Sequence, residues 1–148
     1  TLELEGDYEI AYLPVVDGVV SVTGLTNGVG HLFRVSACNQ GENPDYCGDG
    51  FITGNVVPFG PPSPPNIVAS SLPDGVTFAW GGAVANGRDI ETVELALDGG
   101  PWQAAPQSGS LSINTGCGIS HTLRVRASSA GVVGIEKSVT RSSAACSP

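Results

Sequence analysis

The chain of 148 residues has no methionine, no long apolar run and only six lysines and arginines, against 14 acids. Nucleic acids and anionic membrane surfaces are recognised through basic surfaces, so a net charge of −8 excludes both as expected partners. No stretch shows a useful length of helical periodicity, which excludes a helical fold, and no apolar run is long enough for membrane insertion. A signal peptide is missing too, so we expect a piece of a mature ectodomain or an excised segment.

Glycine and proline are abundant instead, with 21 and 11 copies, and short apolar runs lie between them. This composition is typical of an all-β protein with frequent turns. Residues 31–37 and 121–127 both read His-x-apolar-Arg-Val-x-Ala, and they contain both histidines of the chain. Alternation within each copy predicts a half-buried antiparallel strand whose histidine, central apolar, valine and alanine residues face a core.

The repeat predicts two domains, residues 1–60 and 61–148, because its copies are 90 residues apart. Prolines concentrated in residues 58–65 form the linker and favour a semi-rigid polyproline II conformation. Charge is distributed unevenly between the domains. Residues 1–60 contain eight acids against Arg34 alone, a net charge of −7, whereas residues 61–148 contain six acids against five bases, a net charge of −1.

Four cysteines allow three disulfide connectivities, and one pair falls in each copy of the repeat. The economical pairing is Cys38–Cys47 and Cys117–Cys146. Zinc is the competing interpretation, but no Cys-x-x-Cys pair is present and the histidines belong to the core pattern. Disulfides indicate an oxidising, extracytoplasmic location.

Each repeated strand follows a glycine turn, Asn27-Gly28-Val29-Gly30 or Thr115-Gly116-Cys117-Gly118. An apolar residue, such a turn and then a ring side chain resemble the corner before strand F of a fibronectin type III domain, with His31 and His121 where a tyrosine usually stands. The resemblance covers nearly the whole chain, and its corners are similar to those of Gram-positive tandem repeats. It implies two immunoglobulin-like antiparallel β-sandwiches in tandem, with backbone hydrogen bonds made by the corner imidazoles.

The second domain matches the family from end to end. Trp80 stands where the family has its core tryptophan, on an inward-facing strand with Val76 and Phe78. Asp98-Gly99-Gly100 predicts a hairpin turn. The expected strands are residues 66–69, 76–80, 91–97, 111–113, 121–127 and 137–142, with a short strand at Trp102.

We expect the first domain to be incomplete at its N-terminus, because too few residues precede its third strand for strands A and B. Either the chain is a piece of a longer one, or residues 2–5 are a shortened strand B. Residues 8–13 resemble strand C, residues 2–5 a shortened strand B, residues 19–23 strand E and residues 51–57 strand G. A sandwich without an edge strand exposes unpaired backbone groups, so we expect a homodimer or strand exchange through this domain.

Two sets of residues are candidates for chemical sites. His31 and His121 occupy equivalent positions in a repeat, which favours packed corner residues over metal ligands or general bases. Glu42, Asp45 and Asp49 were considered for Ca²⁺, but they lack the spacing of a calcium loop, and a solvated acidic loop is the simpler interpretation. We therefore predict no catalytic residue, no metal and no cofactor.

Partner-binding residues are predicted in the loop between strands B and C, at Trp102, and in the acidic loop. Asn86-Gly87-Arg88 resembles a short recognition sequence that rearranges to an integrin-binding form after deamidation, although Asn-Gly is first a turn former. Trp102 is either an exposed hot spot or a shield over the sheet. Glu42 and Asp45 are the predicted partner-binding residues of the acidic loop. Separately, we expect three arginines to pair with acids on the outer face of the sheet: Arg34, Arg124 and Arg126.

The expected function is that of an extracellular protein-binding or adhesion module, not an enzyme. It is anchored to a cell surface or cell wall by segments outside this chain, and it engages a host protein through the interdomain elbow and loops. Two alternatives are cytokine-receptor-like binding, for which the Trp-Ser-x-Trp-Ser signature is absent, and a spacer in a secreted carbohydrate-active enzyme. Both rest on fold analogy.

Overall fold

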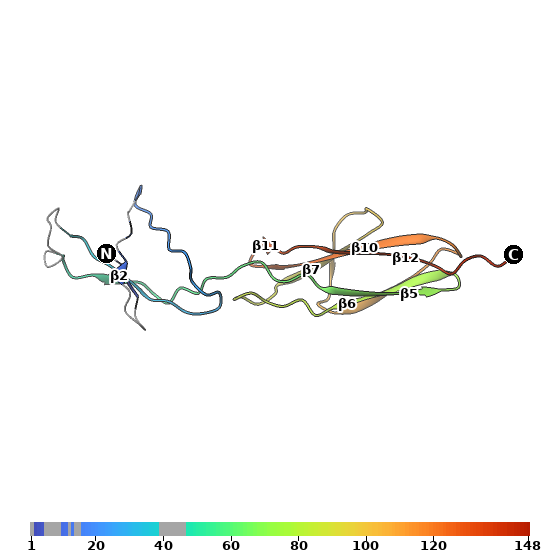
Figure 1. The fold of residues 1–148 in the computed structure, drawn as a ribbon, viewed down its shortest axis with the longest axis horizontal. Helices are drawn as coiled ribbons and strands as arrows, with labels where there is room; N and C mark the ends of the chain where they lie inside the picture. Colours follow the sequence, from blue (N-terminus) through green and yellow to red (C-terminus); the bar gives the residue numbers. More distant parts are fainter. Residues whose placement is uncertain (1, 5–9, 12, 14–15, 39–46) are drawn as a thin grey trace. The chain divides into compact units, whose positions relative to one another are not determined.

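A computed structural model describes residues 2–4, 10–11, 13, 16–38 and 47–148 (Figure 1). The protein is all-β: these residues form antiparallel sheets and no helix. The chain divides into two compact units, Thr1–Phe59 and Gly60–Pro148, which are described one at a time below. Among the described residues no helix is long and apolar enough to cross a membrane.

The second unit contains two antiparallel sheets. Five strands form the larger one, in the order β11 (Val132–Val133), β10 (Ser120–Ser129), β7 (Thr92–Leu97) and β8 (Gln103–Ala105), with β12 (Lys137–Ser142) also paired to β10. The smaller sheet has the order β5 (Asn66–Leu72), β6 (Gly75–Gly81) and β9 (Gly109–Asn114). The strands expected from the sequence in this unit are present, except that the short strand placed at Trp102 begins one residue later, at Gln103.

The inner faces of these sheets enclose one apolar core. From the smaller sheet it contains Val76, Phe78 and Trp80, as the alternation of that strand predicts, and the larger sheet contributes Val93, Leu123, Val125 and Ala127. The indole N–H of Trp80 donates to the Pro106 carbonyl at 3.0 Å, so its one polar group is satisfied. The second copy of the repeat is therefore buried as expected.

A tight hairpin joins β7 to β8. Asp98 and Gly99 both have positive φ, 49° and 75°, and the Gly100 N–H donates to the Leu97 carbonyl at 2.8 Å. This is the conformation that Asp-Gly favours between twisted antiparallel strands. The hairpin predicted from the sequence is confirmed.

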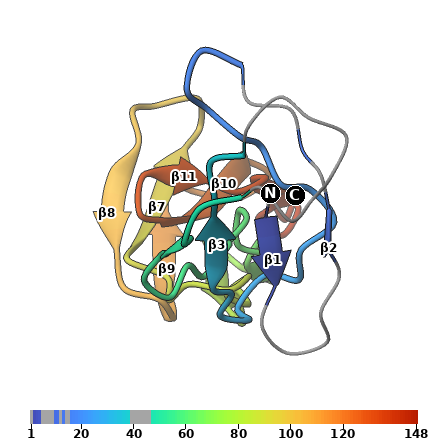
Figure 2. The same ribbon diagram turned by 90° about the vertical axis from the view of Figure 1, so that its left-hand side faces the viewer.

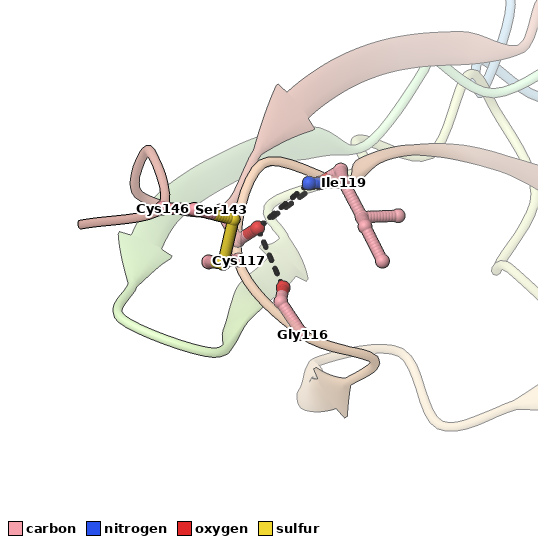
Figure 3. Close-up of a disulfide and its surroundings, with 5 residues drawn as sticks. All are labelled: Gly116, Cys117, Ile119, Ser143 and Cys146. Carbon is pink, nitrogen blue, oxygen red and sulfur yellow. Dashed lines mark hydrogen bonds between the residues drawn. A yellow bond between two sulfur atoms is a disulfide. The ribbon is translucent and has the colours of Figure 1, made fainter. Parts of the chain in front are cut away.

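Both disulfides have the economical pairing, Cys38–Cys47 and Cys117–Cys146. Around the second one, buried Ser143 ties the turn before β10 to the chain after β12 (Figure 3). Its hydroxyl accepts from the Ile119 N–H at 2.9 Å and donates to the Gly116 carbonyl at 2.8 Å. This end of the unit is closed by a covalent bond and by hydrogen bonds around it.

The described residues of the first unit form a four-stranded sheet, in the order β2 (Ile10–Ala11), β1 (Leu2–Leu4), β3 (Phe33–Val35) and β4 (Phe51–Ile52). Figure 2 labels the first three of these strands. The strand paired with β3 on this side is β1, formed by residues expected as a shortened strand B. In the described part of residues 8–13, which were expected as strand C, β2 pairs with β1. The expected strand over residues 19–23 is absent, and an isolated bridge joins Val16 to Val19 instead.

β4 is shorter than the predicted strand over residues 51–57. His31 pairs with Val56 and Arg34 with Ile52, so the strand of β4 has one extra residue between these two pairs. It has another extra residue between the pairs Val35–Phe51 and Cys38–Cys47. Such bulges bend a strand and interrupt its pairing, which limits regular pairing to two residues.

The first copy of the repeat is not buried as its alternation predicts. Phe33 is buried, but Val35 is 47% exposed and Ala37 is exposed too. Among its described residues, eight large hydrophobic residues of this unit are exposed: Val16, Val19, Val29, Val35, Phe51, Ile52, Val56 and Val57. In that part of the chain no second sheet packs on this one, so no second sheet there buries its apolar residues.

Candidate functional site

A groove in the second unit is the best candidate for a binding site. It has a volume of about 420 Å³ and is formed by the start of the unit, the loop between β6 and β7, and the residue Ile135. Its lining residues are Pro61, Pro62, Ser63, Pro64, Val84, Ala85, Asn86 and Ile135. Val84 is 64% exposed and Ile135 is 75% exposed. The groove therefore offers an apolar surface to solvent.

Four hydrogen bonds hold the two sides of this groove together. The Gly60 N–H donates to the Asn86 carbonyl at 2.9 Å, and the Asn86 side-chain amide donates to the Pro61 carbonyl at 3.3 Å. Further along, the Ser63 N–H donates to the Val84 carbonyl at 2.9 Å, and the Val84 N–H donates to the Ser63 hydroxyl at 2.8 Å. The proline-rich start of the unit is thus fixed against the loop.

The Asn86-Gly87-Arg88 sequence lies in this loop. Asn86 lines the groove, Gly87 has a φ of 91°, and the Arg88 carbonyl accepts from the Ser129 hydroxyl at 3.2 Å. The structure therefore places the predicted recognition sequence beside the groove. Its role in binding stays a prediction.

Trp102 lies on a different surface, the outer face of the larger sheet. The guanidinium carbon of Arg126 is 4.1 Å from a ring centroid of this indole, and that of Arg124 is 4.9 Å away. Arg126 also pairs with Glu94 at 2.9 Å, and Arg124 with Glu136 at 3.4 Å. The predicted pairing of these two arginines with acids is confirmed, and the half-buried indole is engaged in cation–π contacts.

His121 is the centre of a side-chain network that the sequence did not reveal. Nδ1 lies 2.7 Å from an Asp98 carboxylate oxygen and Nε2 lies 2.6 Å from the Thr115 hydroxyl. A carboxylate can only accept, so Nδ1 carries the hydrogen, and in the neutral ring Nε2 accepts from Thr115. These partners are side chains, so the backbone hydrogen bond expected of this corner residue was the wrong kind of contact.

The carboxylate of this network is stabilised in its charged form. Partial burial acts to raise the pKa of Asp98, but the hydrogen bonds from His121 and from the Thr122 N–H, with the nearby His121 charge, outweigh it and lower the pKa. The other oxygen of Asp98 accepts from that N–H at 2.8 Å. One carboxylate therefore fixes the hairpin turn against β10.

An acid, an imidazole and a hydroxyl in line are also the arrangement of a catalytic triad. Next to Thr115, however, the Gly116 N–H donates to the Asp74 carbonyl at 3.0 Å, so this donor is already engaged and is not directed to an oxyanion. The groove does not include Thr115. The network therefore serves to join the β7–β8 turn, the end of β9 and β10.

Two predicted partner-binding residues, Glu42 and Asp45, lie outside the described residues. No cluster of three metal-ligating side chains occurs in the part of the chain that the structure describes. The sequence analysis did not identify the groove residues Val84 and Ile135. Each is an apolar residue in a segment otherwise typical of a loop, and this pattern could have indicated an exposed apolar surface.

Comparison with known proteins adds no relative to this description. No protein-family model matches the chain, and no curated protein matches it significantly.

Proposed function

We propose that this chain is an extracellular protein-binding module, built from tandem immunoglobulin-like domains of the fibronectin type III kind, that acts in adhesion at a cell surface. In the second unit, β5-β6-β9 faces a sheet of β8, β7, β10 and β12, and this grouping supports the family resemblance. Two disulfides support an oxidising, extracellular location.

The groove is the observation that carries the binding function. Its lining is mainly proline, valine, alanine and isoleucine, and no charged side chain belongs to it. Val133, two residues before Ile135 in the chain, is also 50% exposed. A partner of matching chemistry is a protein segment that presents leucine- or phenylalanine-sized side chains.

Charge restricts the partner further. The chain has a net charge of −8, of which −1 lies in residues 61–148, so the field of the whole chain favours basic partners over acidic ones. We therefore assign the groove to an apolar segment flanked by lysine or arginine. Sugar stacking on Trp102, the contact that the carbohydrate-linked alternative would use, is disfavoured because two guanidinium groups already contact that indole.

The test is an NMR titration of the chain with a peptide of alternating leucine and lysine, beside the same peptide with glutamate in place of lysine. We expect saturable shifts of the Ser63, Val84 and Ile135 amides with the lysine peptide only. Ile135→Ser removes them, and Val68→Ser does not. Val68 is 66% exposed on β5, outside the groove lining, and serves as the matched control.

Two results would overturn the proposal. One is the absence of any saturable shift in the groove with either peptide. The other is saturable binding that Ile135→Ser leaves unchanged, since the binding surface would then lie elsewhere.

A further inference from the structure

The chain has two Asn-Gly sequences, Asn27-Gly28 and Asn86-Gly87, and both asparagines are exposed. In this dipeptide the backbone nitrogen of the glycine is unhindered, so it can attack the side-chain carbonyl carbon of the preceding asparagine. A five-membered succinimide then forms. The two sites therefore have the same intrinsic chemistry, and only their surroundings distinguish them.

The attacking nitrogen is held in the first site. The Gly28 N–H donates to the Pro58 carbonyl at 2.9 Å, in a hydrogen-bonded turn closed from the Val29 N–H to the Thr26 carbonyl. Attack requires this nitrogen to lose its proton and to rotate toward the side chain. A hydrogen bond to a carbonyl opposes both steps because it would have to break first.

The second site lacks this protection. No hydrogen-bond acceptor for the Gly87 N–H occurs among the residues that the structure describes, and the residue has a φ of 91° in an open bend. The side-chain amide of Asn86, which contains the leaving group, donates to the Pro61 carbonyl at 3.3 Å. The attacking nitrogen of the second site is therefore available, whereas that of the first site is engaged.

We propose that Asn86 is a site of spontaneous covalent modification, and that its conversion releases the proline-rich start of the second unit from the loop between β6 and β7. The Gly87 nitrogen forms a bond to Cγ of Asn86, the Cγ–Nδ2 bond breaks, and ammonia leaves with the proton from that nitrogen. Water then opens the succinimide, giving aspartate or isoaspartate. No oxidant or reductant is needed.

The product loses the hydrogen bonds that Asn86 makes across the groove. A carboxylate cannot donate to the Pro61 carbonyl, and its oxygen would face another oxygen. In the isoaspartate the main chain is one methylene longer, which displaces the carbonyl that accepts from the Gly60 N–H at 2.9 Å. The bonds between Ser63 and Val84 remain, so the release affects the first residues of the segment.

The experiment ages the disulfide-intact chain at mildly alkaline pH and maps deamidation by mass spectrometry after cleavage at arginine. Arg34 and Arg88 separate the two sites into different peptides. In the native chain Asn86 is expected to convert several-fold faster than Asn27. In the reduced and denatured chain the two rates converge, because the sequence is then the only determinant.

Equal native rates, or faster conversion of Asn27, would show that the environment of Gly87 does not select this site. The release is measured separately, by hydrogen exchange of the Gly60 amide. Loss of one ordinary hydrogen bond accelerates this exchange about fivefold in the aged chain.

Asn86→Gln is the matched control. Glutamine keeps an amide donor but would need a less favourable six-membered ring, so the aged variant keeps slow exchange at Gly60. Unchanged Gly60 exchange after confirmed conversion would overturn the structural consequence. Neither measurement involves a partner, so their outcome is independent of the binding function proposed for the groove.

Discussion

The two units contain the same seven-residue strand in different surroundings. In the second unit His121 is bonded on both ring nitrogens and its strand has a fully buried leucine, valine and alanine. In the first unit Nε2 of His31 is buried without a partner among the described residues, and the equivalent Val35 is 47% exposed. A strand pattern specifies which residues share a face, but burial of that face requires an opposing layer.

The comparison also separates two sources of stability. The second unit combines a core between two sheets with a disulfide that spans 29 residues. The first unit has a disulfide that spans only nine residues and one buried hydrophobic residue, Phe33, in its described part. We therefore expect substitutions to act strongly in one unit and weakly in the other.

The largest difference is expected from truncating a phenylalanine in each unit. Phe78 is fully buried in the core, so Phe78→Ala should lower the free energy of unfolding of the second unit by about 3–5 kcal/mol. Phe33→Ala should leave that transition unchanged. Urea unfolding followed by Trp80 fluorescence measures both, and equal losses would mean that the two units unfold as one body.

Removing the disulfides should have the next largest effect. In the chain-entropy model, opening the Cys117–Cys146 loop with serines costs about 3.5 kcal/mol. The same change at Cys38 and Cys47 should not move the unfolding midpoint of the second unit. A shift produced by the second pair of substitutions would contradict the separation of the units.

Asp98→Asn should cost about 1 kcal/mol at neutral pH, because an exposed carboxylate loses its charged hydrogen bonds to His121 and Thr122. The folded-state pKa of Asp98 is lowered, so the stabilisation is complete above the unfolded pKa and is lost as pH falls through the folded one. The difference between wild type and variant should therefore shrink below about pH 4. Asp89→Asn, at an exposed loop residue, is the control and should show no such convergence.

The smallest effect expected is weak self-association through the first unit. Phe51 is 72% exposed on a sheet that no second sheet covers within the described part of the unit, and a second copy of the chain can supply that layer. Because each first unit has a net charge of −7, salt should strengthen the association by screening repulsion. Sedimentation at increasing concentration tests this, with Phe51→Lys as the variant that abolishes it. A mass independent of concentration and salt would contradict the prediction.

Local patterns predicted much of the second unit. Alternation placed β6 and β10, the family resemblance placed β12, Asp-Gly identified the hairpin, and the position of one cysteine pair in each repeat indicated the connectivity. These features depend on residues close in the chain or on the alternation of side chains between the two faces of a strand.

The failures concern contacts between distant residues. Asp98 is 23 residues from His121, and Pro61 is 25 residues from Asn86, so neither contact follows from spacing. The exposure of Val35 was missed for the same reason, since its strand pattern is identical to the buried copy. In the first unit, the bulges beside β4 changed the strand length in a way that alternation alone does not encode.

Native-state hydrogen exchange of the whole chain tests the contrast between the units most directly. We predict slow exchange of the Val76, Phe78, Leu123 and Val125 amides, at rates set by unfolding of the second unit, and exchange close to the unstructured rate for Phe33 and Val35. Protection of Phe33 and Val35 comparable to that of Leu123 and Val125 at low concentration would contradict the account, because the first unit would then be closed without a second layer.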